Sequence, residues 1–401
     1  MQDNAPKTQP TNILFASPAD WRGVRGRFQH LASIMAQHNR VLYLDTLGMR
    51  PATLRPDDLR RMTGKLGHFV RRDTAAKVTT PENLRVVSPL VLPLPPNRLV
   101  RAMNQTLLRR FVNKEMAALD FRDPLVWIAY PHPDWVAILD QLGNGPVIYD
   151  VVDAWGQFNG LYSDLVASEE KLLRRADLVF STAPALREHA AAYNPRSFLV
   201  PNGVDVERFC TNAPQPADLA SIPRPRLGFI GNIAEWVNVD LMVALARAHP
   251  DWHIVIVGPW QRPGSPPSAP NLHWLGTRPY TEVPNYLASF DACLIPFAEN
   301  DLTRAVDPLK LYEYLAAGCP VIATPLPSAS PDLLPLVYWA QDLAGFEAAI
   351  TQALDEPDSN ATERREAIKR HSWEQRMSVI ANIIHEHLGV EIYPNNNENG
   401  T

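Results

Sequence analysis

The sequence predicts an α/β protein with two doubly wound domains, each a parallel sheet flanked by helices. Short apolar segments recur between segments of helical periodicity, which is the pattern of parallel strands that alternate with helices. The chain has 401 residues, too many for one ordinary core and suitable for two domains of the usual size. Hydrophobic residues make up 46% and charged residues 20%, so the composition indicates a folded globular protein.

The first half of the chain is predicted to form one doubly wound domain over residues 1–200. Its apolar segments predict strands at residues 13–16, 41–44, 86–92, 125–129, 147–151, 178–181 and 198–200. Its periodic segments predict helices at residues 28–36, 99–119, 165–175 and 185–192.

A cluster of turn-forming residues, Pro201-Asn202-Gly203-Val204-Asp205, predicts the domain boundary near residue 201. A second series of strands is predicted at residues 227–230, 254–257, 272–275, 292–295, 321–323 and 337–340. The second domain is therefore expected over residues 201–372, with a last helix within residues 373–390. The Asn-rich end, residues 391–401, is expected to be a disordered tail.

Several classes of protein lack their principal signatures here. No G-x-G-x-x-G follows a predicted strand and no G-x-x-x-x-G-K-[ST] occurs, so dinucleotide-binding and P-loop enzymes are not favoured. The three cysteines, Cys210, Cys293 and Cys319, lie far apart without C-x-x-C spacing, which argues against a disulfide framework or a zinc site. With no apolar leader and no run of about 18 apolar residues, we expect a cytoplasmic protein.

The most informative segment runs from Asp307 to Ile322, with the sequence DPLKLYEYLAAGCPVI, and predicts a short helix. Pro308 suits the first turn of this helix and Gly318 suits its C-cap. Lys310 and Glu313 are three residues apart and share one face near the positive end of the helix. A diphosphate fits beside Lys310 while Glu313 accepts hydrogen bonds from a ribose diol. The alternative is an exposed ion pair on an ordinary helix.

This segment resembles the donor-site helix of group 1 (family 4-like) glycosyltransferases with the GT-B fold, whose motif reads P-x-K-L-x-E-Y-L-A-x-G-x-P-V-I. The residues V-P-N-G-V-D at 200–205 and the glycine turns at 228–231 and 256–259 are similar to the same family. The resemblance covers roughly the whole chain and is closest to the teichuronic-acid and xanthan-type exopolysaccharide transferases. It implies two Rossmann-like domains that face a cleft, with the last helix packing back toward the first domain.

The resemblance implies that the second domain holds a nucleoside diphosphate sugar. Lys310, Glu313 and Gly231 are the matching donor-binding residues. Two groups that many members use are missing, because Ala305 stands where they carry Glu and residues 232–238 lack their Arg and Lys. Arg304 and Asp307 are candidates to replace these two groups.

Two acidic residues, Asp150 and Asp153, lie at and just beyond the end of a predicted strand, where ligands bind in doubly wound folds. They face opposite ways on an extended strand, so only one is expected to enter the cleft. Xanthan-type relatives have a Y-x-x-x-D segment whose last Asp is the general base, which implies that role for Asp153. The alternative is that Asp153 caps the following helix. His132 ends another strand, where a catalytic role competes with a structural one.

The loop at residues 18–27 is similar to the acceptor loop of the family. Its candidates are Gly23 and Gly26, which let the backbone approach a ligand, and Arg25 and Arg27, which suit phosphate. A solvated basic loop is the alternative.

Residues 50–114 are rich in Arg and Lys, interleaved with apolar residues, although the whole chain carries a net charge of −5. This stretch predicts peripheral contact with an anionic membrane on its cytoplasmic face. Nucleic acid is the weaker alternative, because no nucleic-acid motif is present.

These observations predict a glycosyltransferase that moves a sugar from a nucleoside diphosphate sugar to a lipid-linked or polysaccharide-precursor acceptor in cell-surface polysaccharide synthesis. No cofactor and no metal are expected, because Asp150-x-x-Asp153 is not a D-x-D motif and no other acidic cluster suits Mg²⁺. A nucleotide-sugar epimerase is one alternative. The other is a non-catalytic nucleotide-sugar-binding partner, which the missing donor-site groups favour.

Overall fold

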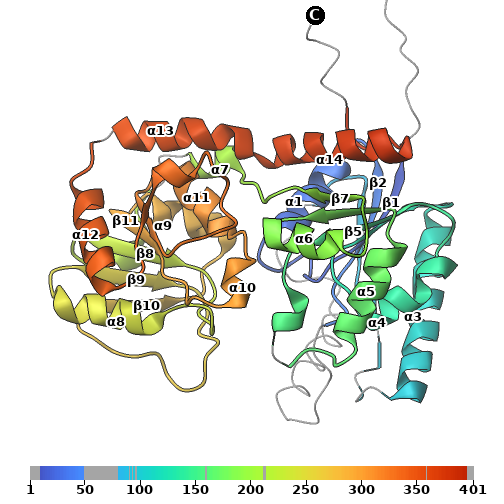
Figure 1. The fold of residues 1–401 in the computed structure, drawn as a ribbon, viewed down its shortest axis with the longest axis horizontal. Helices are drawn as coiled ribbons and strands as arrows, with labels where there is room; N and C mark the ends of the chain where they lie inside the picture. The colour runs from blue at the N-terminus through green and yellow to red at the C-terminus, as the bar shows by residue number, and fades with distance from the viewer. Residues whose placement is uncertain are drawn as a thin grey trace, which may run out of the picture. The chain divides into compact units, whose positions relative to one another are not determined.

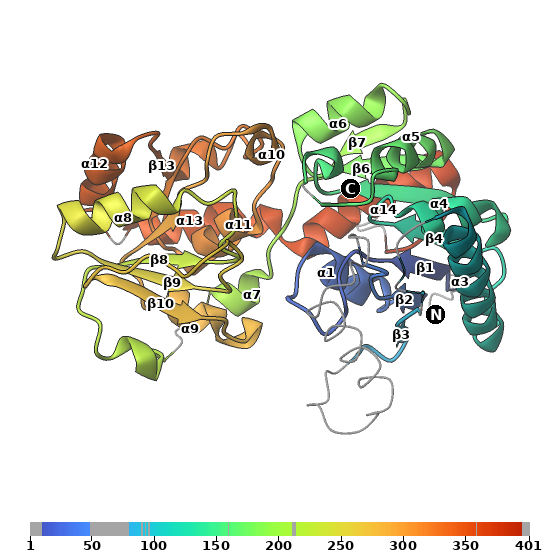
Figure 2. The same cartoon turned by 90° about the horizontal axis from the view of Figure 1, so that it is seen from below.

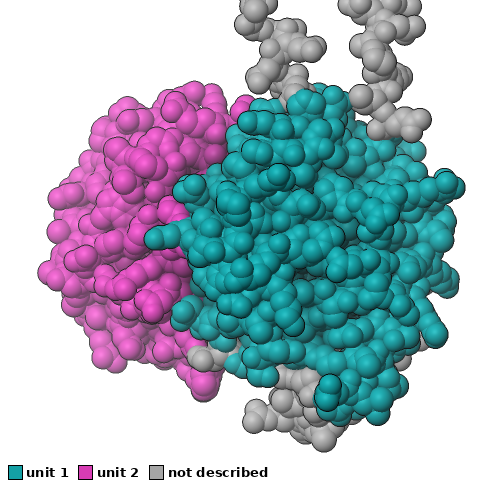
Figure 3. Space-filling model, turned by 45° about the vertical axis from the view of Figure 1, so that its right-hand side comes forward, with its two compact units in different colours: residues 1–181, 186–199, 377–401 teal, residues 182–185, 200–376 magenta. Residues whose placement is uncertain are grey.

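Two parallel sheets organise the chain. A computed structural model describes residues 10–48, 80–89, 91–92, 94, 97–158, 160–210, 214–357 and 359–394. The chain divides into two units (Figure 3): unit 1 comprises residues 1–181, 186–199 and 377–401, and unit 2 comprises residues 182–185 and 200–376. Each unit contains one sheet flanked by helices (Figures 1 and 2).

The sheet of unit 1 has the strand order β3-β2-β1-β4-β5-β6-β7 and every described pairing in it is parallel. Its strands are β1 (Asn12–Ala16), β2 (Arg40–Leu44), β3 (Leu84–Val87), β4 (Leu125–Ile128), β5 (Val147–Val151), β6 (Leu178–Ser181) and β7 (Ser197–Leu199). The order reverses between β1 and β4, which is the switch point where ligands bind in this architecture. The rings of Tyr43, Phe15, Trp127 and Phe180 stack in sequence, with centroids 5.5–5.7 Å apart, and form part of the core.

The helices of unit 1 cover this sheet. They are α1 (Arg27–Met35), α3 (Arg98–Ala118), α4 (Pro133–Ile138), α5 (Leu165–Arg175) and α6 (Pro184–Ala191). Most of α14 (Trp373–Leu388) also belongs to unit 1, where the ring of His387 lies 4.9 Å from that of Phe198.

The sheet of unit 2 has the order β10-β9-β8-β11-β12-β13 and is also parallel, with its switch point between β8 and β11. Its strands are β8 (Arg226–Ile230), β9 (His253–Val257), β10 (Leu272–Gly276), β11 (Ala292–Ile295), β12 (Val321–Ala323) and β13 (Val337–Trp339). Its helices are α7 (Val206–Phe209), α8 (Val239–Ala248), α9 (Val283–Leu287), α10 (Asp301–Arg304), α11 (Leu309–Ala317), α12 (Leu343–Leu354) and α13 (Ser359–Ile368).

The predicted fold class, an α/β protein with two Rossmann-like domains, is confirmed. One strand differs clearly from its prediction: β3 spans Leu84–Val87, whereas we expected residues 86–92. The strand ends there for two reasons. The Ser88 hydroxyl donates a hydrogen bond to the Asp45 side chain, at Oδ2 and 2.5 Å, and Pro89 has no N–H to donate to a neighbouring strand. Short helices such as α7, α9 and α10 carry too little periodicity to be predicted.

The expected disorder from residue 391 onward is wrong for the residues that the structure describes. Ile392 is only 1% exposed, and its carbonyl accepts a hydrogen bond from Asn39 Nδ2 at 2.6 Å. The Glu391 carbonyl accepts from the Thr11 hydroxyl at 2.8 Å, and the ring of Tyr393 lies 5.4 Å from that of His38. Residues 395–401 lie outside the described part of the chain, as do residues 50–79 of the predicted membrane stretch, residues 50–114. Among the described helices, none has the length and apolar character needed to cross a membrane.

Candidate active site

Two glycines open the C-terminal edge of the second sheet. Gly231 follows β8 and Gly258 follows β9, and both have φ of +147°, a conformation that other residues rarely adopt. A Cβ atom on Gly258 would lie 1.9 Å from the carbonyl oxygen of Gly231. Only glycine therefore allows the two turns to approach each other at this edge, beside the switch point.

Helix α11 begins at the same edge. Its N-cap is Pro308, one residue before the position that the sequence suggested, and its C-cap is Gly318 with φ of +81°, as predicted. The Tyr314 hydroxyl accepts a hydrogen bond from Ile230 N at 2.8 Å, which ties the helix to the end of β8. This bond holds the first turn of α11 beside Gly231, where a Cβ atom would lie 3.1 Å from Lys310 Nζ.

The ammonium of Lys310 lies between two aromatic rings at this edge. Its Nζ is 5.0 Å from the ring centroid of Phe229 on β8 and 4.8 Å from that of Phe297, which follows β11. In the described part of the chain, Lys310 has no hydrogen bond and no ion pair. Burial lowers the pKa of Lys310 to about 8, although the charge of Glu313 opposes this shift. The side chain is a partly desolvated cation at a helix N-terminus, which is suited to binding an anion.

Glu313 lies one turn along the same helix and is held by a residue that the sequence analysis missed. The Tyr280 hydroxyl donates a hydrogen bond to Glu313 Oε1 at 3.0 Å. The guanidinium of Arg208 lies 5.4 Å from the Tyr280 ring. Burial raises the pKa of Glu313 to about 7, against the opposing effects of the Tyr280 bond and of Lys310 and Arg208. No sequence spacing connects Tyr280 with Glu313, so only the fold reveals this pair.

The other two predicted donor-binding residues lie in different environments. Arg304 ends α10, is exposed, and lies 3.5 Å from Asp301 of the same helix. Asp307 is buried, its Oδ2 accepts from Asn202 N at 2.6 Å, and its Oδ1 accepts from the Tyr312 hydroxyl at 2.8 Å. Because both carboxylate oxygens of Asp307 are engaged, we correct its role from donor binding to joining the segment around Asn202 to α11.

In unit 1, Asp150 and Arg27 form a buried ion pair. Arg27 Nε lies 2.9 Å from Asp150 Oδ2, Nη2 lies 2.9 Å from Oδ1, and the side chains are 3% and 0% exposed. We expected Arg27 to meet an acceptor phosphate, but it instead neutralises the carboxylate at the end of β5. This pair leaves Asp153 as the other carboxylate of the predicted segment.

Asp153 follows the end of β5 and is half-buried. Its carboxylate makes no hydrogen bond within the described residues, and the next helical turn, η2 (Trp155–Gln157), has Ala154 as its N-cap. The helix-capping alternative is therefore not supported. Burial raises the pKa of Asp153 to about 7, so the group exchanges protons near neutral pH.

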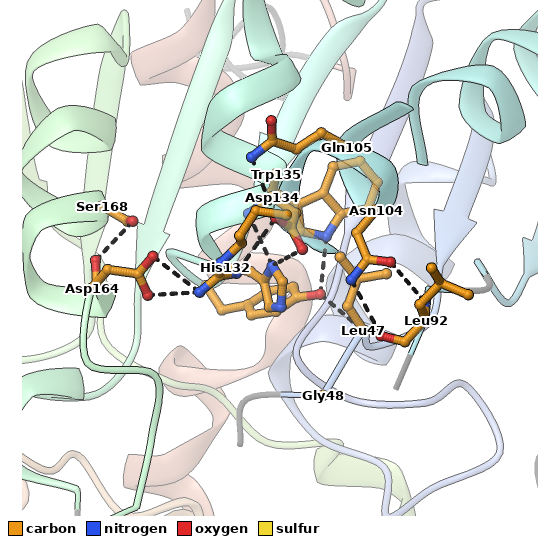
Figure 4. Close-up of polar contacts among 12 residues, drawn as sticks. Leu47, Gly48, Leu92, Asn104, Gln105, His132, Asp134, Trp135, Asp164 and Ser168 are labelled. Atoms are coloured by element: carbon orange, nitrogen blue, oxygen red, sulfur yellow. Dashed lines mark hydrogen bonds and ion pairs between the residues drawn. The ribbon is translucent and has the colours of Figure 1, made fainter. Parts of the chain in front are cut away.

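His132 occupies the N-cap of α4, at the switch point of the first sheet (Figure 4). It is 1% exposed, and its Nδ1 accepts a hydrogen bond from Asp134 N at 3.1 Å. Burial and the charge of Arg101 lower the pKa of His132 to about 3, so the ring is neutral and its proton is on Nε2. This environment favours the structural role over the catalytic one.

The loop after β1 is fixed by local hydrogen bonds. Gly26 is the N-cap of α1 and its N–H donates to Gln29 Oε1 at 3.0 Å, while Gly23 N donates to Asp20 O at 2.9 Å. The half-buried Arg25 donates from Nη2 to Ser33 Oγ at 3.0 Å. Gly23 and Gly26 therefore shape the turn that leads into α1.

Metal ligands do not gather in the residues that the structure describes: no group of three or more His, Cys, Asp or Glu side chains is placed to hold an ion. The expectation of metal-independent chemistry remains a prediction.

Comparison with known proteins identifies the second unit. Residues 224–356 match the family model described as glycosyl transferases group 1. These residues, which form most of unit 2, match a group 1 glycosyltransferase domain. The match includes both glycine turns, Lys310 and Glu313, and it confirms the family resemblance found in the sequence.

A curated protein also has a sequence similar to part of this chain. The putative teichuronic acid biosynthesis glycosyltransferase TuaH of Bacillus subtilis is 32% identical over 229 residues. The alignment covers 52% of this chain and 58% of the relative, so the chain matches little more than half of that protein's length.

Solved structures share the fold of the whole chain. Sucrose-phosphate synthase from Thermosynechococcus elongatus has a TM-score of 0.65 at 17% identity, covering 94% of this chain and 99% of that one. Alr3699/HepE of Anabaena, solved with UDP and glucose, has a TM-score of 0.63 at 15% identity, covering 94% and 100%. At these identities the likeness establishes the GT-B fold.

Removing one partner of the Arg27–Asp150 pair should destabilise unit 1. Asp150→Ala removes the carboxylate that pairs with the buried Arg27, and we expect a loss of about 3–5 kcal/mol in the free energy of unfolding, measured with urea. The double variant Arg27→Met with Asp150→Leu should recover most of this loss, because it removes both charges and keeps the volume filled. A double variant as unstable as Asp150→Ala would contradict this account.

Glu313 should make stability depend on pH. Its pKa of about 7 in the folded protein lies above its ordinary value, so the folded state keeps a proton that the unfolded chain has lost. The contribution is therefore most favourable below about pH 4 and is lost as the pH rises to about 7. In urea unfolding across this range, Glu313→Gln should flatten the decline, whereas the exposed control Glu235→Gln should not. An unchanged slope in Glu313→Gln would rule out this contribution.

Proposed function

We propose that this chain transfers a sugar from a nucleoside diphosphate sugar to a lipid-linked or polysaccharide-precursor acceptor at the cytoplasmic face of a membrane. The observation that carries the proposal is the environment of Lys310: a partly desolvated ammonium that has no hydrogen-bonding partner among the described residues, at the N-terminus of α11 and against Gly231. The named roles of the teichuronic acid relative and of the neighbour solved with UDP and glucose support the classes of acceptor and donor.

On the donor side, negative charge develops on the diphosphate as its bond to the anomeric carbon breaks. Lys310 and the N–H groups of the first turn of α11 are placed to stabilise that charge, because they already point to the edge of the sheet. The absence of a side chain on Gly231 leaves room for a diphosphate beside Nζ. Glu313 would accept hydrogen bonds from the ribose hydroxyls, with Tyr280 fixing one of its carboxylate oxygens.

On the acceptor side, a hydroxyl oxygen attacks the anomeric carbon and must lose its proton. In an inverting reaction we assign proton acceptance to Asp153, whose pKa of about 7 makes it a stronger base than an exposed carboxylate. His132 is a poor candidate, because its accepting nitrogen already receives the Asp134 N–H and its ring is buried. No cofactor or metal enters this scheme.

Lys310→Ala should weaken nucleoside diphosphate binding while leaving the protein folded. A charge-assisted contact of roughly 1.5–3 kcal/mol corresponds to about a 10- to 150-fold loss of affinity. Titration calorimetry with UDP, GDP and ADP measures this loss for the tightest of the three. Lys369→Ala, an exposed lysine paired with Glu366 in the same unit, is the matched control. Unchanged affinity in Lys310→Ala would remove this residue from the site.

Asp153→Asn should abolish transfer without affecting donor binding. The substitution keeps the shape but removes proton acceptance, so turnover should fall by about 10²–10⁴-fold. Release of nucleoside diphosphate from UDP-glucose, with a bacterial lipid extract as acceptor, measures turnover, and Asp140→Asn is an exposed control. In the parent, kcat/KM should rise with an apparent pKa of about 7. Near-normal turnover in Asp153→Asn would exclude it as the base.

A further inference from the structure

Helix α3 presents an apolar stripe on its outer face. Leu99, Met103 and Leu107 are 70%, 45% and 41% exposed, and their spacing of four residues places them on one side of the helix. Together with Leu94, which is 48% exposed, they account for four of the nine large hydrophobic side chains that are exposed in the described residues. Three of these side chains lie on one helix and the fourth lies shortly before it, and such a concentration marks an interaction surface rather than scattered surface residues.

The other side of α3 packs on the core of unit 1. Its buried side chains are Val100, Asn104, Leu108, Val112 and Met116. Figures 1 and 2 show α3 on the outside of unit 1, beside α4. The apolar stripe is thus additional to the face that packs on the core.

Basic side chains flank the stripe. Arg98, Arg110 and Lys114 are exposed and form no ion pair within the described residues. The helix carries five basic residues and one acidic residue, Glu115, which pairs with Arg85, whereas the whole chain has a net charge of −5. An apolar stripe with basic residues beside it complements a lipid bilayer, whose interior is apolar and whose headgroups carry negative charge.

The stripe lies on the half of α3 nearest the edge that carries Asp153. Arg101, between Leu99 and Met103, reaches Asp164 Oδ1 at 2.7 Å and Asp134 Oδ1 at 3.4 Å. These two acidic residues follow β5 and β4, at the same C-terminal edge of the first sheet as Asp153.

We propose that the outer face of α3 docks on an anionic phospholipid surface. Leu99, Met103 and Leu107 enter the boundary between headgroups and acyl chains, and the basic residues face the phosphates. The stripe extends about 12 Å along the helix, which gives reversible peripheral binding rather than permanent insertion. The inference rests on the proposed function in one respect: if the acceptor is anchored to a lipid, docking of α3 would bring the sheet edge that carries Asp153 close to that acceptor.

The test is cosedimentation of the full-length protein with phosphatidylcholine vesicles, with and without phosphatidylglycerol. The parent should bind only the anionic vesicles, and less at high salt. The variant Leu99→Ser, Met103→Ser, Leu107→Ser should partition at least about tenfold more weakly. The variant Arg98→Gln, Arg110→Gln, Lys114→Gln should lose roughly a hundredfold, because each basic residue contributes about fivefold.

Matched triple variants of unit 1 serve as controls and should bind like the parent. The apolar control replaces exposed residues away from α3 by Ser: Val166, Leu199 and Val379. The basic control replaces exposed residues away from α3 by Gln: Arg122, Lys171 and Arg196. Circular dichroism establishes that each variant is folded, and Leu99→Ser alone replaces the triple if that protein does not fold.

Three outcomes would overturn the proposal. One is equal vesicle binding by the stripe variant and its control. Another is no binding of the parent to anionic vesicles. The third is a dimer, detected by analytical ultracentrifugation, that the stripe variant abolishes, since a second copy of the chain would then cover this face. UDP binding, measured on the same proteins, reports unit 2 separately. Loss of UDP binding with intact vesicle binding would count against the proposed function alone.

Discussion

The positive charge of Lys310 is the constraint around which the edge of the second sheet is built. Burial penalises an ammonium, and the N-terminus of a helix carries a partial positive charge that repels it. The rings of Phe229 and Phe297 offset part of this cost by presenting their faces to Nζ. An anion would relieve the rest, because it compensates the ammonium and the helix end together. The buried charge is thus suited to the diphosphate site that we propose here.

At the C-terminal edge of the first sheet the charged residues are carboxylates. Two carboxylates, three residues apart, differ in their surroundings: Asp150 is neutralised by Arg27, whereas Asp153 is half-buried and its carboxylate has no hydrogen bond or ion pair within the part of the chain that the structure describes. The paired group maintains the local structure, while the unpaired group has its pKa raised to about 7. Such separation of environments allows neighbouring carboxyl groups to take distinct roles. His132 falls on the structural side of the same division, since its ring caps α4.

Local sequence patterns predicted most of the helices and strands. They did not predict the contacts between residues that are far apart in the sequence. The apolar periodicity located the strands, and Pro308 with Gly318 bounded α11 to within one residue. The partners of the site residues carry no such signal, because Tyr280 and Glu313 are 33 residues apart and Arg27 and Asp150 are 123 apart. Arg27 and Asp307 were therefore predicted as ligand contacts from their charge, although buried partners engage both. The membrane contact predicted for residues 50–114 includes most of α3, but the sequence did not show which side chains of this helix are exposed, since a periodic segment does not reveal which of its faces lacks cover.

The desolvation of Lys310 affects the free energy of unfolding of unit 2. A lysine that is desolvated and has no ion pair among the described residues lowers the stability of the unliganded protein. Its removal should therefore cost little stability, while ligand binding would lose a charge contact. The same reasoning applies to Glu313, where burial opposes ionisation and a ribose diol would favour it. If the proposed function holds, a bound nucleotide would stabilise both charged groups. Its binding would then add to the free energy of unfolding of this unit, by about 2.7 kcal/mol for a ligand at a hundred times its Kd.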